Sequence, residues 1–118
     1  MIDGVTFNTG DDCIAIKSGR DADGRRVNVP CTNVVIQNCD FADGHGGITL
    51  GSEMTGGVRN VYARDLAMNS ANLRAGHRIK TNTLRGGFVE NSNRRRRPSD
   101  VMRGARPRPR RARAAGRR

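Results

Sequence analysis

The sequence has few aromatic residues and no long apolar run, and both shortages limit what the chain can be. Aromatic residues make up 3% of the 118 residues, and tryptophan is absent. No apolar stretch approaches the roughly 20 residues that cross a bilayer, and no charged-then-apolar leader precedes the first predicted strand. We therefore expect no membrane span and no export signal within these residues, and the compartment stays unknown at this point.

Cysteine and histidine are also scarce. Three cysteines, Cys13, Cys31 and Cys39, leave at least one thiol unpaired and show no C-x-x-C spacing. The two histidines do not cluster with other ligands, so a structural zinc site has little support. Residues 21–24 start like a calcium loop, but Thr32 stands where such a loop needs a bidentate Glu. The sequence therefore predicts no metal site and no cofactor.

The positive charge is concentrated at one end of the chain. The formal net charge is +11, yet residues 1–93 hold ten Lys plus Arg and ten Asp plus Glu. Residues 94–118 hold twelve Arg, a single acid and hardly any large apolar residues. A segment of this composition cannot bury enough surface to fold. We therefore divide the chain into a folded region, 1–93, and a disordered Arg-rich tail, 94–118.

Two interpretations of the tail are open. Its arginines would neutralise phosphates or other anions, including nucleic acid and pectin, and this binding would be unspecific because no aromatic residue is present for base stacking. Alternatively, the tail is an out-of-frame extension of a truncated gene, since a low-complexity segment that interrupts a repeat has no folding rationale.

Internal similarity predicts the fold. Residues 33–41 are echoed by residues 60–68, 27 residues later, and residues 2–7 resemble the end of an earlier copy. Short β runs, polar turns and little helical periodicity predict an all-β solenoid in which each repeat is one coil. Each copy then passes through a turn into a second short strand. We place these second strands at residues 13–17, 47–50 and 78–81.

The predicted solenoid is short and interrupted. Residues 20–30 are best explained as a loop that bulges from one coil. About three coils are present, and both ends offer unpaired strand edges, which favour self-association or a partner.

Stacking these coils brings ionisable residues onto neighbouring rungs, which are about 4.8 Å apart. Arg78 and Lys80 flank Ile79 at period two, so both face outward if Ile79 faces the core. The combined surface holds two carboxylates, an imidazole and two cations. These groups belong to Asp11, Asp12, His45, Arg78 and Lys80.

Each group also has a simpler explanation. Two like charges as close as Asp11 and Asp12 do not both ionise freely, which favours the protonated carboxyl that a general acid needs. Asp-rich stretches are, however, common in turns. His45, among glycines, fits a loop, and cations on a strand commonly form a solvated face. These ionisable residues nevertheless fall at equivalent places on three successive repeats, and this agreement favours the functional interpretation.

Three segments resemble, in order and spacing, the signature segments of the polygalacturonase family, glycoside hydrolase family 28. They are Gly-Asp-Asp-Cys-Ile-Ala-Ile-Lys-Ser-Gly at 10–19, Gly-His-Gly-Gly at 44–47 with Leu-Gly-Ser at 50–52, and Arg-Ile-Lys-Thr at 78–81. The resemblance covers roughly residues 1–91. It implies a truncated piece of a right-handed parallel β-helix that hydrolyses α-1,4-linked galacturonic acid in pectin with inversion.

The resemblance assigns a role to each candidate residue. Asp11 would be the general acid, Asp12 would help to activate the attacking water, and His45 would tune the proton of the acid. Arg78 and Lys80 would bind galacturonate carboxylates, which suits cations and an anionic sugar. An inverting site holds its carboxyl groups about 6.5–9.5 Å apart with a water between them.

The chain departs from the family pattern at two points. The family has an upstream Asn-Thr-Asp segment that this chain does not contain, and the single Tyr62 lies before Arg78 rather than after it. Two function classes therefore remain: a polygalacturonase-type glycosidase, inactive if the missing groups are essential, and polyanion binding by the tail on a non-catalytic β-helix remnant. The resemblance implies a secreted or periplasmic protein.

Overall fold

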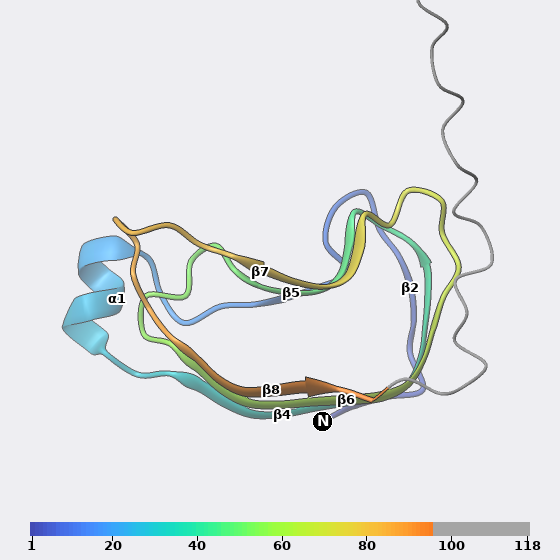
Figure 1. Ribbon diagram of the computed structural model, residues 1–118, viewed down its shortest axis with the longest axis horizontal. Coiled ribbons are helices and arrows are strands. Elements are labelled where there is room, and N and C mark those ends of the chain that lie inside the picture. Colours follow the sequence, from blue (N-terminus) through green and yellow to red (C-terminus); the bar gives the residue numbers. More distant parts are fainter. Residues whose placement is uncertain (96–118) are drawn as a thin grey trace, which may run out of the picture.

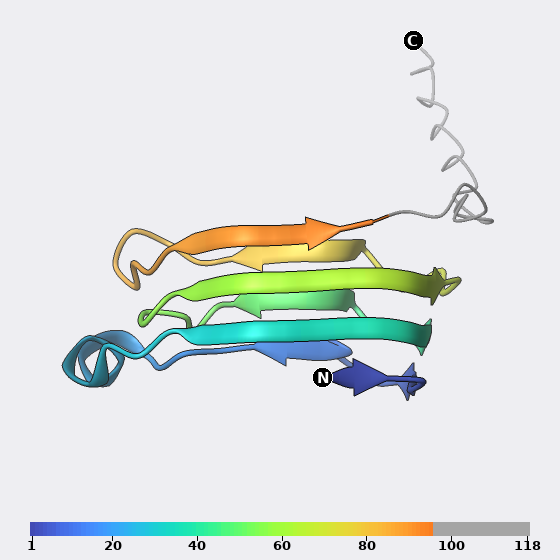
Figure 2. The ribbon, with the colours of Figure 1, turned by 90° about the horizontal axis from the view of Figure 1, so that it is seen from below.

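The computed structural model describes residues 1–95, which form two parallel sheets that face each other across a core (Figure 1). The first sheet contains β1 (Ile2–Asp3), β2 (Thr6–Asn8), β4 (Cys31–Asp43), β6 (Val58–Met68) and β8 (Val89–Arg94). The second contains β3 (Ile14–Ile16), β5 (Gly46–Gly51) and β7 (Ala75–Lys80). Figure 2 shows the strands of each sheet stacked in chain order. The predicted parallel β-helix is confirmed.

The strand register confirms the repeat that the sequence predicted. Val34 pairs with Val61, which is the 27-residue offset of the sequence repeat. A side-chain ladder of Asn33, Asn60 and Asn91 follows the same column. The Asn60 amide donates to Asn33 Oδ1 over 3.0 Å, and the Asn91 amide donates to Asn60 Oδ1 over 3.2 Å. All three have φ between 50° and 59°, a left-handed bend that asparagine tolerates better than most residues.

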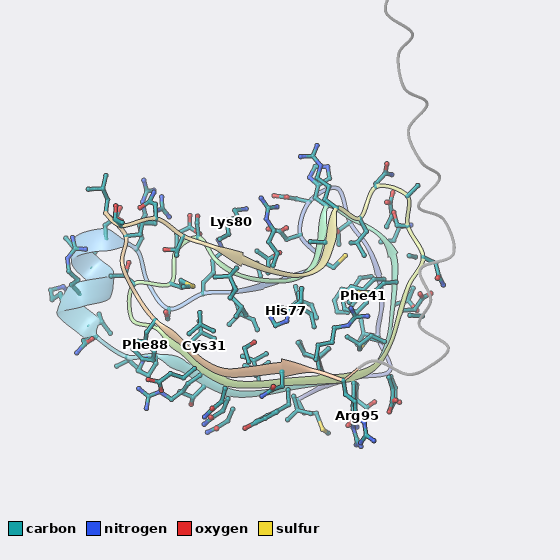
Figure 3. All side chains as sticks on the ribbon, viewed as in Figure 1. Cys31, Phe41, His77, Lys80, Phe88 and Arg95 are labelled. Atoms are coloured by element: carbon teal, nitrogen blue, oxygen red, sulfur yellow. The ribbon has the colours of Figure 1, made fainter. Side chains whose placement is uncertain are left out.

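The core lies between the two sheets and is built from columns of stacked side chains. One column runs Ile16, Leu50 and Ile79, and another stacks the rings of Phe7 and Phe41 at 5.1 Å. Figure 3 shows Phe41 and His77 between the sheets. Ile79 is nevertheless 58% exposed, because no further described rung covers this end. Since Ile79 belongs to an inward column, its neighbours face outward as predicted.

The loop predicted at residues 20–30 is wrong in part, because it contains the helix α1 (Asp21–Val27). Two acids lie in the first turn of α1 and two arginines in its last turn, which complements the helix dipole. Asn28 ends the helix in the left-handed conformation. Gly24 is buried against Thr55, and no larger residue would fit there, because a Cβ at this position would lie 2.6 Å from Thr55 Cβ. The Asp-x-Asp-Gly start resembled that of a calcium loop and concealed this short helix.

The folded part extends slightly beyond the predicted boundary. The strand β8, which the sequence did not predict, includes Arg94, the first residue of the predicted tail. Residues 96–118, which hold the rest of that tail, lie outside the described residues. Within residues 1–95 the three cysteines are free, and no helix is long and apolar enough to cross a membrane.

Candidate active site

The second sheet bends sharply along β5 and β7 (Figure 1), and the candidate site extends from this bend along the outer side of the sheet to the end of β7. Glycines allow close approach of the chain at this bend. A Cβ at Gly47 would lie 2.6 Å from the Gly76 carbonyl oxygen, and a Cβ at Gly46 would lie 2.5 Å from Asp12 Oδ1. The segment between β2 and β3 packs against the same bend, where the Cys13 N–H donates to the Gly46 carbonyl over 2.8 Å. Small residues thus let the Asp-Asp segment approach β5 closely.

Asp12 is the buried carboxylate of the site. Its side chain is 8% exposed, and its Oδ2 lies 3.3 Å from Lys80 Nζ. Its Oδ1 is fully buried and has no hydrogen-bond partner among the described residues. Asp12 precedes β3 and Lys80 ends β7, two rungs apart, so the solenoid itself creates this pair.

Asp11 is the exposed carboxylate, with a side chain that is 82% exposed. Its Oδ1 lies 3.4 Å from His45 Nδ1. The backbone N–H of His45 donates to the Asp11 backbone carbonyl over 2.9 Å. The His45 carbonyl accepts from the Arg74 N–H over 2.8 Å. Backbone bonds from two neighbouring coils therefore hold the imidazole beside the exposed acid.

Arg78 and Lys80 extend the site along β7. They lie opposite Thr49 and Gly51 of β5 and are both partly buried. Figure 3 shows Lys80 on the outer side of the second sheet, away from the core. The five residues predicted from the sequence thus come from three successive rungs, and the two carboxylates lie beside the imidazole and the lysine, respectively.

Asp43 supports the site and was not predicted. It accepts hydrogen bonds from the Ser70 hydroxyl over 2.6 Å, from the Asn72 amide over 3.1 Å, and from the Gly44 N–H over 2.9 Å. These donors hold the pKa of the Asp43 carboxyl below its usual range. Its carbonyl accepts from the Cys13 thiol over 3.2 Å. One residue therefore joins the three turns that carry the site.

Glu53 makes a second cross-coil contact, at the other end of the second sheet. It pairs with Lys17 of the first coil, and its Oε1 lies 2.8 Å from Arg85 Nη1 of the third. Lys17 first and Arg85 second hold the pKa of the Glu53 carboxyl far below its usual range. The cross-coil contacts of Asp43 and Glu53 were not predicted from the sequence, because neither acid belongs to a recognisable motif.

The arrangement suits acid–base chemistry on an anionic substrate. An exposed carboxyl lies beside an imidazole, and the adjacent residue carries a buried carboxyl beside a lysine ammonium. Within residues 1–95 no group of three or more His, Cys, Asp or Glu residues could hold a metal ion. Separately from that finding, carboxyl and imidazole groups are side chains that can donate and accept protons.

Comparisons with known proteins identify relatives of the chain. The Vitis vinifera protein named "Probable polygalacturonase" is 41% identical over 83 residues, covering 70% of this chain and 16% of that protein. The Dickeya chrysanthemi exo-poly-alpha-D-galacturonosidase is 34% identical over 77 residues, covering 64% of this chain and 13% of that protein. The chain thus spans about a sixth of the length of the curated relatives it matches.

A solved structure shares the fold. The crystal structure of a hyperthermoactive exopolygalacturonase from Thermotoga maritima has a TM-score of 0.67 and 49% sequence identity, covering 73% of this chain and 19% of that one. The model of the glycosyl hydrolases family 28 matches residues 1–93, which include every residue of the candidate site. Because this match covers most of the chain, the protein belongs to glycosyl hydrolase family 28.

Proposed function

We propose that the bend of the second sheet is the cleavage site of a polygalacturonase, which hydrolyses α-1,4-galacturonosidic bonds with inversion. The observation that carries the proposal is the pairing of Asp11 with His45 at 3.4 Å and of Asp12 with Lys80 at 3.3 Å on one outward surface. The relatives named polygalacturonase and exo-poly-alpha-D-galacturonosidase support galacturonan as the substrate class.

Asp11 is the general acid of the proposed reaction. Its exposure lets the carboxyl reach the glycosidic oxygen of a bound polymer, to which it transfers its proton as the bond to the anomeric carbon breaks. His45 adjoins the acid, with its Nδ1 3.4 Å from Asp11 Oδ1. Asp11 ends the step as a carboxylate.

Asp12 assists the attacking water. Water adds to the anomeric carbon from the face opposite the leaving group, and its proton passes to a carboxylate base. Asp12 Oδ2 lies next to the Lys80 ammonium, whose side chain is 37% exposed, and in this proposal that oxygen is the one on the substrate side. Attack from the opposite face inverts the anomeric configuration.

Arg78 and Lys80 bind the carboxylates of the galacturonate units. The Arg78 guanidinium matches a carboxylate bidentately, whereas the Lys80 ammonium acts as a point charge. Two cations on one strand face would favour free galacturonate over its methyl ester, which carries no charge.

The test is release of reducing sugar from polygalacturonate by the 118-residue chain. Asp11→Asn and Asp12→Asn should each lower the rate at least about 100-fold, the usual cost of losing an acid or base group. Asp23→Asn is the matched control, because this acid is 85% exposed on α1 and should leave the rate unchanged. Undiminished hydrolysis by Asp11→Asn would overturn the assignment.

A further inference from the structure

Thr49 is a buried hydroxyl on the catalytic side of β5. It alternates with Ile48 and Leu50, which belong to the core, so its side chain faces outward toward the site. It is nevertheless 0% exposed. Its Oγ1 has no hydrogen-bond partner among the described residues. An outward threonine that is fully covered and unpaired requires an explanation.

The second unpaired oxygen lies in the same place. Asp12 Oδ1 is also buried without a partner in the described part of the chain. Both oxygens lie 2.5 Å from the point that a Cβ on Gly46 would occupy, so they are at most about 5 Å apart. The next nearest atom to that point, setting aside the neighbours of Gly46, is Asp12 Cγ at 3.5 Å. The two oxygens therefore lie close together against the Gly46 backbone, on the side from which a Cβ would project.

One water molecule would satisfy both oxygens. Two hydrogen bonds of about 2.8 Å span up to about 5.6 Å, which exceeds the largest separation that the geometry allows. An ionised carboxylate only accepts hydrogen bonds, whereas a hydroxyl both donates and accepts. Water can donate to Asp12 Oδ1 and accept from Thr49. Buried waters in proteins typically bridge polar groups of this kind.

We propose that Thr49 is a positioning residue that holds Asp12 through one buried water. The water bridges Thr49 Oγ1 and Asp12 Oδ1, while Lys80 contacts Oδ2. With a donor on each oxygen, the carboxylate has one preferred orientation, with Oδ2 toward the substrate side. The bridge stands on geometry alone, and its benefit to catalysis rests on the proposed function.

The bridge is tested by crystal structures of the 118-residue chain, at a resolution that shows ordered water. The unmodified protein should hold a water within about 3.2 Å of both oxygens. Thr49→Ser should retain this water, and Thr49→Val, which has nearly the same shape, should lose it. An unmodified structure with both side chains in place and no water between them would overturn the bridge.

The positioning role is tested by kinetics on polygalacturonate. Thr49→Val should lower kcat about 10-fold with KM changed less than about 2-fold, and Thr49→Ser should restore kcat. Ser18→Ala is the matched control, since it removes another buried hydroxyl that has no partner within residues 1–95, on the segment after β3. This variant should keep the unmodified kcat.

The outcomes separate the two proposals. If Asp12→Asn is inactive while Thr49→Val keeps the unmodified kcat, the positioning role is wrong and the proposed function stands. If the unmodified chain releases no sugar, the proposed function of this chain fails and the positioning role fails with it. The crystal structures then still decide whether the bridge exists.

Discussion

At the scale of single residues, Gly46 controls how closely Asp12 approaches β5. A Cβ there would lie 2.5 Å from both Asp12 Oδ1 and Thr49 Oγ1, so one of these side chains has to move. We expect Gly46→Ala to lower kcat on polygalacturonate at least 10-fold, because misplacing a reacting group by about 1 Å costs that much or more.

Gly10→Ala is the control for Gly46→Ala. A Cβ on Gly10 would meet no atom within 4 Å, so this variant should keep its activity although it precedes Asp11. Melting curves of both variants separate loss of folding from loss of function. Equal kcat for the two alanine variants would show that Gly46 does not limit the position of Asp12.

Arg78 should determine the preference for a charged sugar. Removing its guanidinium removes a charge-assisted contact without breaking the pair of Asp12 and Lys80. We expect Arg78→Gln to raise KM for polygalacturonate about 10-fold and to reduce the preference over methyl-esterified pectin. Initial rates on both polymers measure this change. The KM of Arg78→Lys should lie between that of the unmodified chain and that of Arg78→Gln. An unchanged ratio of rates would exclude Arg78 from carboxylate recognition.

The sequence predicted the five residues of the candidate site but not the residues that support them. Asp11, Asp12 and His45 stand in recognisable segments, and Arg78 and Lys80 follow from period-two alternation. The same alternation places Thr49 on the outer face, but it does not show that the bend of β5 covers it completely. Asp43 acquires its role from Ser70 and Asn72 on another coil, a contact that a local pattern does not encode.

At the scale of elements, the asparagine ladder fixes the bends of the first sheet. Asn60 has a φ of 57° and bonds to Asn33 and Asn91. Asn60→Ala should lower the free energy of unfolding by about 2 kcal/mol. The left-handed conformation is about 1 kcal/mol less favourable for alanine, and each of the two lost hydrogen bonds contributes about 0.5 kcal/mol.

Asn60→Gly isolates the hydrogen-bond part of this loss. Glycine adopts the bend freely, so this variant should lose about 1 kcal/mol less than Asn60→Ala. Urea denaturation of both variants measures the difference. If Asn60→Gly were as unstable as Asn60→Ala, the backbone bend would contribute nothing and the ladder alone would matter.

Elements were predicted well where the repeat is regular and poorly where it is not. The 27-residue offset between β4 and β6 revealed both strands. Asn60 and Asn91, by contrast, are 31 residues apart, and the longer connection before β8 concealed that strand. The helix α1 is an insertion in one coil, so no second copy existed with which to compare it.

At the scale of the whole molecule, two carboxyl groups join the three coils and make stability depend on pH. Glu53 and Asp43 have folded pKa values below those of the unfolded chain, near 4.3 and 3.9. The unfolded chain therefore binds more protons in acid. Their stabilisation is fully present above about pH 5 and is lost as the pH falls toward 2.

Glu53→Gln tests this dependence. Melting temperatures between pH 7 and pH 3 should fall less steeply for this variant than for the unmodified chain, and the variant should melt lower at pH 7. Asp23→Asn should keep the unmodified slope, because Asp23 is 85% exposed and its ion pair with Arg26 lies within its own helix. Parallel curves for Glu53→Gln and the unmodified chain would show that the contacts with Lys17 and Arg85 do not carry the acid sensitivity.

If stacking the three coils assembles one galacturonate-binding surface, as we propose, trigalacturonate should bind where the three coils meet. Titration of the isotope-labelled 118-residue chain with trigalacturonate, followed by amide NMR shifts, locates the binding surface. We expect the largest shifts at residues 10–13, 44–46 and 78–80. Shifts confined to the outer face of the first sheet, around the exposed Tyr62 and Arg64, would contradict it.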